Sequence, residues 1–211
     1  MSRRRHSSPS AISSLKADLR KQVLAQRDAL PSSQRHALSE RITKRLLALG
    51  AYRSARCVMA YASFGSELDT AAFLADVLAQ GKKLVLPRVE RGNRMLQLHA
   101  VDDPARQLAP GVWGIPQPRA DVCPPVPVSE LEFVLVPGVA FTRRGERLGY
   151  GGGYYDGFIR SLAPRPPLIA AAFELQILPE LPSTDRDQAI DLVVTEDAEY
   201  HIPSPPVGGE G

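Results

Sequence analysis

The sequence predicts an α/β fold: three α/β/α layers, a mostly parallel sheet with flanking helices, and an N-terminal helical hairpin. Short apolar runs alternate with helical stretches from Arg56 onward, which is the pattern of a parallel sheet covered by helices. Before Arg56, apolar residues recur at helical spacing in two stretches. The length of 211 residues and the hydrophobic fraction of 44% suit one domain with a sizeable core.

The two N-terminal helices are indicated by apolar residues three or four positions apart. The first helix carries Leu15, Leu19 and Val23. The second carries Leu38, Ile42, Leu46 and Leu49. Ser32 or Ser33 is suited to cap its start, and Gly50 lies just past its end. The chain is therefore expected to open as a helical hairpin.

The remaining elements follow in chain order. Strands are expected at 57–61, 83–89, 95–98, 133–136, 168–173 and 190–194, and helices at 69–80 and from Tyr155 through Leu162. The residues Arg91-Gly92-Asn93 are typical of a hairpin turn. The stretch from Pro104 to Pro127 contains the only tryptophan and is too rich in proline for regular structure.

Composition limits the organisation and the partners of the protein. We expect one catalytic α/β domain over 13–202 between disordered tails at 1–12 and 203–211. The net charge of +3 derives largely from arginines near the N-terminus, without the basic stripe of a nucleic-acid-binding protein. No apolar run approaches the roughly 18 residues of a membrane span. No apolar stretch typical of a secretion signal follows the arginines, so we expect a cytoplasmic protein, although a transit peptide is an alternative. Cys57 and Cys123 form no disulfide framework.

A glycine-rich turn carries the chemistry. It reads Arg147-Leu148-Gly149-Tyr150-Gly151-Gly152-Gly153-Tyr154-Tyr155-Asp156 and follows the apolar run at 133–136. Successive glycines let backbone N–H groups converge, and a following helix N-terminus adds a positive dipole end, so the turn suits phosphate oxygens. Asp156 at its exit is suited to hold a Mg²⁺ ion that bridges phosphates. A glycine-rich surface hairpin is the alternative.

These residues resemble the signature of the 5-formyltetrahydrofolate cyclo-ligase family, also called methenyltetrahydrofolate synthetase. The likeness extends over further segments: Lys16 to Arg20, Ser63 to Asp69, Trp113 to Pro118, Val136 to Phe141 and Asp191 to Glu196. Thr142 and residues 183–187 depart from the family pattern. The resemblance implies ATP- and Mg²⁺-dependent closure of 5-formyltetrahydrofolate to 5,10-methenyltetrahydrofolate, with release of ADP and phosphate. It also implies two small-molecule substrates, ATP and the folate, and we expect a monomer.

The resemblance, together with residue chemistry, assigns the candidate site residues. Arg147, Tyr154 and Asp156 are the candidate catalytic residues. ATP binding is assigned to Lys16, Arg20, Arg147, Leu148, Gly149, Tyr150, Gly151, Gly152, Gly153, Tyr154 and Tyr155. Folate binding is assigned to Glu67, Trp113, Tyr150, Gly151, Gly152, Gly153 and Tyr154. Asp156 and Asp191 are the candidate metal ligands.

Several of these residues also have a simpler interpretation. Lys16 and Arg20 share one helical stripe with Arg27 and could be solvated cations. Glu67 could instead stabilise a helix N-terminus, and Asp191 could form a salt bridge. Trp113 could either close over an aromatic ligand or plug the core. For the whole protein, the alternatives are a non-catalytic nucleotide- or phosphometabolite-binding regulator, or an ATP-dependent ligase or kinase with another acceptor.

Overall fold

The computed structural model describes residues 9–90, 92, 95–184 and 187–203. A seven-stranded sheet forms its centre, in the order β12-β11-β9-β6-β1-β2-β3. These strands are β1 (Cys57–Met59), β2 (Lys83–Glu90), β3 (Met95–Ala100), β6 (Phe133–Val136), β9 (Leu168–Ala171), β11 (Leu192–Val194) and β12 (Glu199–His201). The five inner strands are parallel, and the edge strands β3 and β12 are antiparallel to their neighbours.

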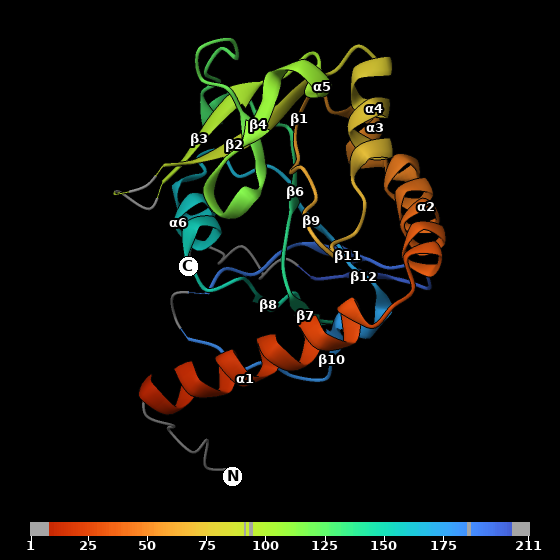
Figure 1. Ribbon diagram of the computed structural model, residues 1–211, viewed down its shortest axis with the longest axis vertical. Coiled ribbons are helices and arrows are strands. Elements are labelled where there is room, and N and C mark those ends of the chain that lie inside the picture. The colour runs from red at the N-terminus through yellow and green to blue at the C-terminus, as the bar shows by residue number, and fades with distance from the viewer. Residues whose placement is uncertain (1–8, 91, 93–94, 185–186, 204–211) are drawn as a thin grey trace, which may run out of the picture.

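Helices cover both faces of the sheet, as the sequence predicted (Figure 1). One face is covered by α2 (Ser32–Ala48), α3 (Gly50–Ser54) and α4 (Ala71–Ala79), and the other by α6 (Tyr154–Ser161). The alternation along β6 explains this arrangement, because Phe133 and Leu135 belong to the core on the α2 side, whereas Val134 and Val136 pack with Phe158 of α6. A strand buried on both faces must be apolar throughout, and β6 is.

The helix α1 (Pro9–Asp28) lies across one end of the layered body, next to the strands β7 (Ala140–Thr142), β8 (Arg147–Leu148) and β10 (Ile177–Leu178) (Figure 1). These three strands form a small sheet of their own. Val23 of α1 is buried there against Val139 and Leu148. The two helices predicted as a hairpin follow each other directly, and each packs on a different part of the body.

Several details differ from the prediction. The N-cap of α2 is Pro31 rather than Ser32 or Ser33. Three further differences concern the start of the chain, Leu15 and residues 104–127. First, α1 begins at Pro9, inside the segment 1–12 expected to be a tail, because proline is well suited to the first turn of a helix. Second, Leu15 was placed on the apolar stripe, yet it is half exposed, since the buried face of α1 lies further along at Val23. Pro203, the first residue of the expected C-terminal tail, lies in no helix or strand. The remaining positions expected in tails, 1–8 and 204–211, lie outside the described residues.

Third, regular structure forms within 104–127. Asp103 caps α5 (Pro104–Gln107) by accepting from the backbone N–H groups of Ala105 and Arg106. β4 (Leu108–Pro110) and β5 (Pro116–Pro118) pair as an antiparallel hairpin around the 3-10 turn η1 (Val112–Gly114). Proline is tolerated because this small ribbon has two edges that need no partner. Further 3-10 turns are η2 (Val128–Glu130) and η3 (Glu174–Gln176).

Candidate active site

The glycine turn has the backbone conformation that its composition predicted. Gly151 has φ 98° and Gly153 has φ 72°, values that other residues rarely adopt. Gly153 is the N-cap of α6, which begins at Tyr154, one residue before the predicted start. A Cβ on Gly152 would lie 2.7 Å from the Tyr154 ring, so no other residue fits there without a shift. The turn thus leads directly into the N-terminus of α6. The positive end of the helix dipole and the free N–H groups there favour a bound anion.

Arg147 lies beneath the turn and is buried. Its guanidinium donates to Asp156 Oδ1 at 2.5 Å and to the carbonyl oxygen of Pro137 at 3.3 Å. Its Nε atom has no hydrogen-bond partner among the described residues. A Cβ on Gly149 would lie 2.8 Å from Arg147 Nη1, so this glycine provides room for the guanidinium. A buried cation with an unused N–H donor beside a glycine turn is suited to bind an anion.

Two cations of α1 reach the site from a distant part of the chain. Arg20 Nε donates to the carbonyl oxygen of Gly149 at 2.7 Å, and its guanidinium lies next to Gly151. Burial lowers the pKa of Arg20, and the nearby charge of Asp187 opposes this shift. Lys16 forms an ion pair with Asp187. The structure therefore brings Arg20 onto the turn and engages Lys16 with the segment before β11.

Glu67 lies in the loop that precedes α4, and it contacts the glycine turn. Its Oε2 accepts from the backbone N–H of Phe64 at 2.9 Å, and its Oε1 accepts from the hydroxyl of Tyr150. Burial raises the pKa of Glu67, while its hydrogen bond from Tyr150 opposes the shift. At the start of α4 the residue that accepts a backbone N–H is Asp69, which bonds Ala71. Glu67 therefore does not act as the cap of this helix.

Arg27 and Ser66 complete a network around Tyr150. Arg27 is buried at the end of α1, and its Nε donates to Ser66 Oγ at 3.0 Å while its Nη1 donates to Tyr150 Oη at 3.1 Å. The sequence placed Arg27 on the stripe of Lys16 and Arg20 but assigned it no role. Its contacts with Ser66 and Tyr150, which lie 39 and 123 positions along the chain, identify it as part of the site.

Exposed aromatic rings surround this network. Trp113 is 64% exposed and packs edge to face on Tyr154, with ring centroids 6.3 Å apart. Phe64 is about half exposed and lies next to Gly114 of the same 3-10 turn, while Tyr150 is also about half exposed. The alternative in which Trp113 plugs the core is therefore excluded. Solvent-exposed aromatic faces are suited to stack on a planar ligand. Phe64 carried no signal in the sequence.

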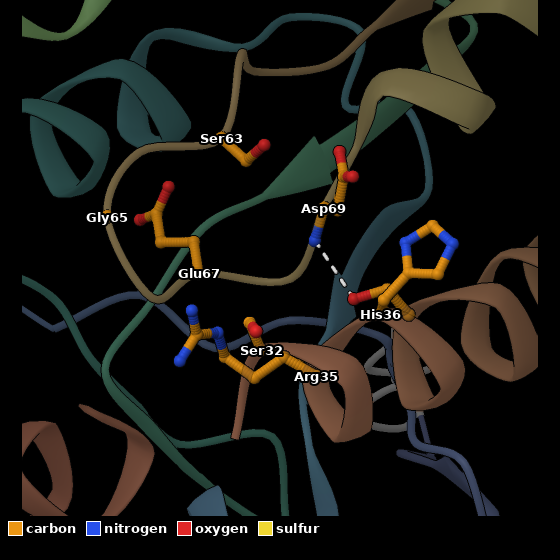
Figure 2. Close-up of a pocket in the computed structure, with 8 residues that line it drawn as sticks. Ser32, Arg35, His36, Ser63, Gly65, Glu67 and Asp69 are labelled. Atoms are coloured by element: carbon orange, nitrogen blue, oxygen red, sulfur yellow. Dashed lines mark hydrogen bonds between the residues drawn. The ribbon is translucent and has the colours of Figure 1, made fainter. Parts of the chain in front are cut away.

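A cavity of about 370 Å³ lies between the loop of Glu67 and the first turns of α2. Its lining is polar and consists of Ser32, Arg35, His36, Ser39, Ser63, Gly65, Glu67 and Asp69. Figure 2 shows the loop curving around the Glu67 carboxylate, with Arg35 and His36 approaching from the helix side. The backbone N–H of Asp69 donates to Ser39 Oγ at 3.1 Å and ties the loop to α2.

Asp191, the second candidate metal ligand, lies elsewhere. Its carboxylate accepts from Arg165 at 2.8 and 3.1 Å and from the backbone N–H of Leu168 at 2.8 Å. It therefore lies where β9 and β11 begin, whereas Asp156 lies in the first turn of α6, at the other end of the crossover that leads to β9. This geometry favours the salt bridge weighed as the alternative.

The donor set for a metal ion is consequently small. Over the part of the chain that the structure describes, no group of three or more histidine, cysteine or acidic side chains could hold one. Asp156 is the carboxylate beside the turn, and its side chain is 26% exposed. Because Mg²⁺ is commonly held by one or two carboxylates together with phosphate oxygens, Asp156 fits such an ion only in company with a bound nucleotide.

Cys57 and Cys123 are both buried free thiols, in agreement with the absence of a disulfide framework. No helix among the described residues is both long and apolar enough to cross a membrane.

Comparisons with known proteins agree on one family. The family model of the 5-formyltetrahydrofolate cyclo-ligases matches residues 12–196. The 5-formyltetrahydrofolate cyclo-ligase of Mus musculus is 29% identical over 195 residues, which cover 89% of this chain and 96% of the mouse protein. That of Escherichia coli K12 is 28% identical over 174 residues, covering 82% and 96% of the two chains.

A solved structure shares the fold. The 5,10-methenyltetrahydrofolate synthetase of Aquifex aeolicus superimposes with a TM-score of 0.80 at 31% identity, covering 93% of this chain and 97% of that one.

Proposed function

Because this chain belongs to the 5-formyltetrahydrofolate cyclo-ligase family, we propose that it uses ATP to close 5-formyltetrahydrofolate to 5,10-methenyltetrahydrofolate, releasing ADP and phosphate. The observation that supports this most is the contact between the glycine turn and Glu67, through Tyr150. The turn that we assign to phosphate and the carboxylate that we assign to folate are therefore in contact, as a phosphoryl transfer between the two substrates requires.

The chemistry explains why ATP is needed. The formyl oxygen on N5 is a poor leaving group, so it first attacks the γ-phosphorus and displaces ADP, giving an iminium phosphate. N10 then attacks the formyl carbon and loses its proton. The C–O bond breaks, phosphate leaves, and the methenyl cation remains. Such a reaction asks the protein mainly to position the substrates and to neutralise charge.

We assign the phosphate side to the glycine turn and the cations around it. The backbone N–H groups of residues 149–154, which include the N-terminus of α6, donate hydrogen bonds to the phosphate oxygens. Arg147 has a free buried donor for an oxygen of the transferred group, and Lys16 and Arg20 approach from α1. Charge-assisted hydrogen bonds from these cations stabilise the negative charge that develops as the phosphoryl group moves.

A Mg²⁺ ion is assigned to Asp156 alone, since Asp191 is engaged by Arg165 and by the backbone of Leu168. When bound, the ion neutralises charge on the phosphates. Asp156 also holds the Arg147 guanidinium in place, so it serves the phosphate side in two ways.

We assign the folate side to Glu67 and the aromatic rim. Glu67 accepts hydrogen bonds from N–H groups of the pterin, and the exposed ring of Trp113 and the partly buried ring of Tyr154 bound the planar ring system. We further propose that the protein acts as a monomer in the cytoplasm.

Absorbance of the methenyl product, recorded with ATP and 5-formyltetrahydrofolate together, tests the function. We expect product only when both substrates and Mg²⁺ are present, with one ADP formed for each methenyl group. ATP consumption without methenyl formation would indicate a ligase or kinase with another acceptor. Tight binding of both ligands without turnover would indicate a regulator.

A further inference from the structure

Arg27 is a buried cation whose direct partners are hydroxyl groups. The residue is 4% exposed, and among the described residues its guanidinium donates only to Ser66 Oγ and Tyr150 Oη. A buried charge is costly unless it is compensated by hydrogen bonds and by opposite charge. The compensation here is indirect, because each hydroxyl donates its own hydrogen bond to a carboxylate.

Hydrogen-bond chemistry fixes the direction of both relays. A guanidinium can only donate, so Ser66 Oγ and Tyr150 Oη must accept from it. Each hydroxyl has a single hydrogen, which Ser66 donates to Asp28 and Tyr150 donates to Glu67. One relay ends at the exposed Asp28, and the other ends at the carboxylate that lines the cavity of Figure 2.

The consequence for Glu67 is a defined role as acceptor. Its Oε1 accepts a hydrogen bond from the Tyr150 hydroxyl and its Oε2 accepts one from the backbone N–H of Phe64. The carboxylate is therefore held at both oxygens and keeps further lone pairs for a ligand. Without Arg27, the Tyr150 hydroxyl could turn and accept, and one of the two restraints on Glu67 would be lost.

Arg20 and Arg27 form hydrogen bonds with consecutive residues of the turn. Arg20 binds the carbonyl oxygen of Gly149 and Arg27 binds the side chain of Tyr150, from positions two helical turns apart on α1. The two arginines therefore have separate roles. Arg20 holds the backbone of the turn, and Arg27 acts through Tyr150 on Glu67.

We propose that Arg27 is a positioning residue for the folate: through Tyr150 it holds Glu67 as a hydrogen-bond acceptor for the pterin. This inference rests on the proposed function, because it takes 5-formyltetrahydrofolate as the ligand of Glu67.

A double-mutant cycle between Arg27 and Tyr150 tests the proposal. Arg27→Met keeps an unbranched apolar stem and removes the donors, while Tyr150→Phe removes only the hydroxyl. Calorimetry gives the Kd of 5-formyltetrahydrofolate and of a non-hydrolysable ATP analogue for both variants, the double variant and the wild type. We expect each single variant to weaken folate binding by about tenfold or more, the effect of one charge-assisted hydrogen bond, with nucleotide Kd changed by less than about threefold. The double variant should be no weaker than the weaker single variant, because the two residues act in series.

The controls separate positioning from general damage. Arg41→Met removes an exposed arginine of α2 that pairs with Asp197, far along the chain from the turn, and should leave both Kd values unchanged. If Arg27→Met does not fold, Tyr150→Phe alone carries the test, because it leaves the Arg27 charge in place and removes only the hydroxyl that links Arg27 to Glu67. A wild-type folate Kd in folded Tyr150→Phe would then overturn the proposal. Additive losses in the cycle, a wild-type folate Kd in a folded Arg27 variant, or equal losses for folate and nucleotide would each overturn the proposal. Failure of the wild type to bind 5-formyltetrahydrofolate would instead contradict the proposed function.

Discussion

The ammonium group of Lys16 forms an ion pair of 2.6 Å with the carboxylate of Asp187, which also accepts from the backbone N–H and the hydroxyl of Thr184. Lys16 is assigned to the phosphates of ATP, so nucleotide and Asp187 compete for the same cation. Burial acts to raise the pKa of Asp187, but the contacts with Lys16 and Thr184 outweigh it, so this pKa lies below its ordinary value.

The first prediction is that Asp187→Asn tightens ATP binding. The variant releases Lys16 and removes a negative charge near the triphosphate, so the KM for ATP should fall by about two- to fivefold, in line with a partly exposed ion pair of up to about 1 kcal/mol. Initial rates at saturating folate measure it. Lys16→Ala should raise the same KM, and an Asp187→Asn enzyme with raised ATP KM would show that Asp187 helps to bind the nucleotide.

The second prediction compares two glycines six positions apart. Gly151→Ala places a side chain at φ 98°, which costs about 1 kcal/mol or more, and distorts the turn that receives phosphate. We expect its ATP affinity to fall at least tenfold. Gly157→Ala is the matched control, since Gly157 lies within α6 with no atom near its added Cβ, and it should bind ATP normally with equal or higher stability. Equal ATP affinity in both variants would contradict the phosphate turn.

The third prediction concerns the two aspartates. Asp156→Asn should lower kcat by about a hundredfold or more, the scale of removing one group that stabilises developing charge, and added Mg²⁺ should restore part of it. Asp191→Asn breaks the pairing with Arg165 and should lower the Tm without changing the Mg²⁺ dependence of the rate. The concentration of Mg²⁺ at half-maximal rate distinguishes the two. A shifted Mg²⁺ requirement in Asp191→Asn would return Asp191 to the metal site.

The fourth prediction is a pH dependence set by Glu67. Burial raises its pKa above the ordinary value of 4.5, and the ionised carboxylate is a stronger acceptor for the pterin N–H groups than the protonated carboxyl group. Folate affinity should therefore fall as the pH drops toward the raised pKa. The Glu67→Gln variant should not show this fall in affinity. At neutral pH that variant should bind folate about ten- to a hundredfold more weakly, the value of a charged hydrogen bond.

Stability should respond to the same group with the opposite sign. A carboxyl group with a raised pKa binds its proton more tightly in the folded state, so its contribution to the free energy of unfolding increases as the pH falls through that pKa. The difference in Tm between wild type and Glu67→Gln, measured across this pH range, checks the sign. A folate affinity independent of pH in this range would remove Glu67 from the folate site.

The main elements could be predicted because burial leaves a direct mark on the sequence. The continuous apolar run at 133–136 is a central strand, and the glycines at 149–153 form a turn before a helix. The strands β7, β8 and β10 were missed, since two or three residues are too few to show a period. The hairpin of β4 and β5 was missed because its prolines obscure any strand signal.

The contacts within the site were less predictable than its composition. The helical stripe of Lys16, Arg20 and Arg27 was visible, but their partners Asp187, Gly149 and Ser66 come from three separate segments. Asp191 was assigned to metal because an apolar strand follows it. Arg165, which forms the salt bridge with Asp191, lies 26 positions away and so could not be identified from the local sequence. Local sequence reports burial and turn geometry, whereas pairing of charges depends on which segments the fold brings together.

Trp113 is the one tryptophan of the chain, and it lies on the exposed rim of the proposed folate site against Tyr154. Its indole emission is therefore free of any second tryptophan and reports from a single place. A ligand that covers the ring removes it from water, so the emission maximum moves to shorter wavelength as the site fills. The protein carries its own optical probe of occupancy, which allows folate arrival to be timed by stopped flow in the native chain without an attached dye.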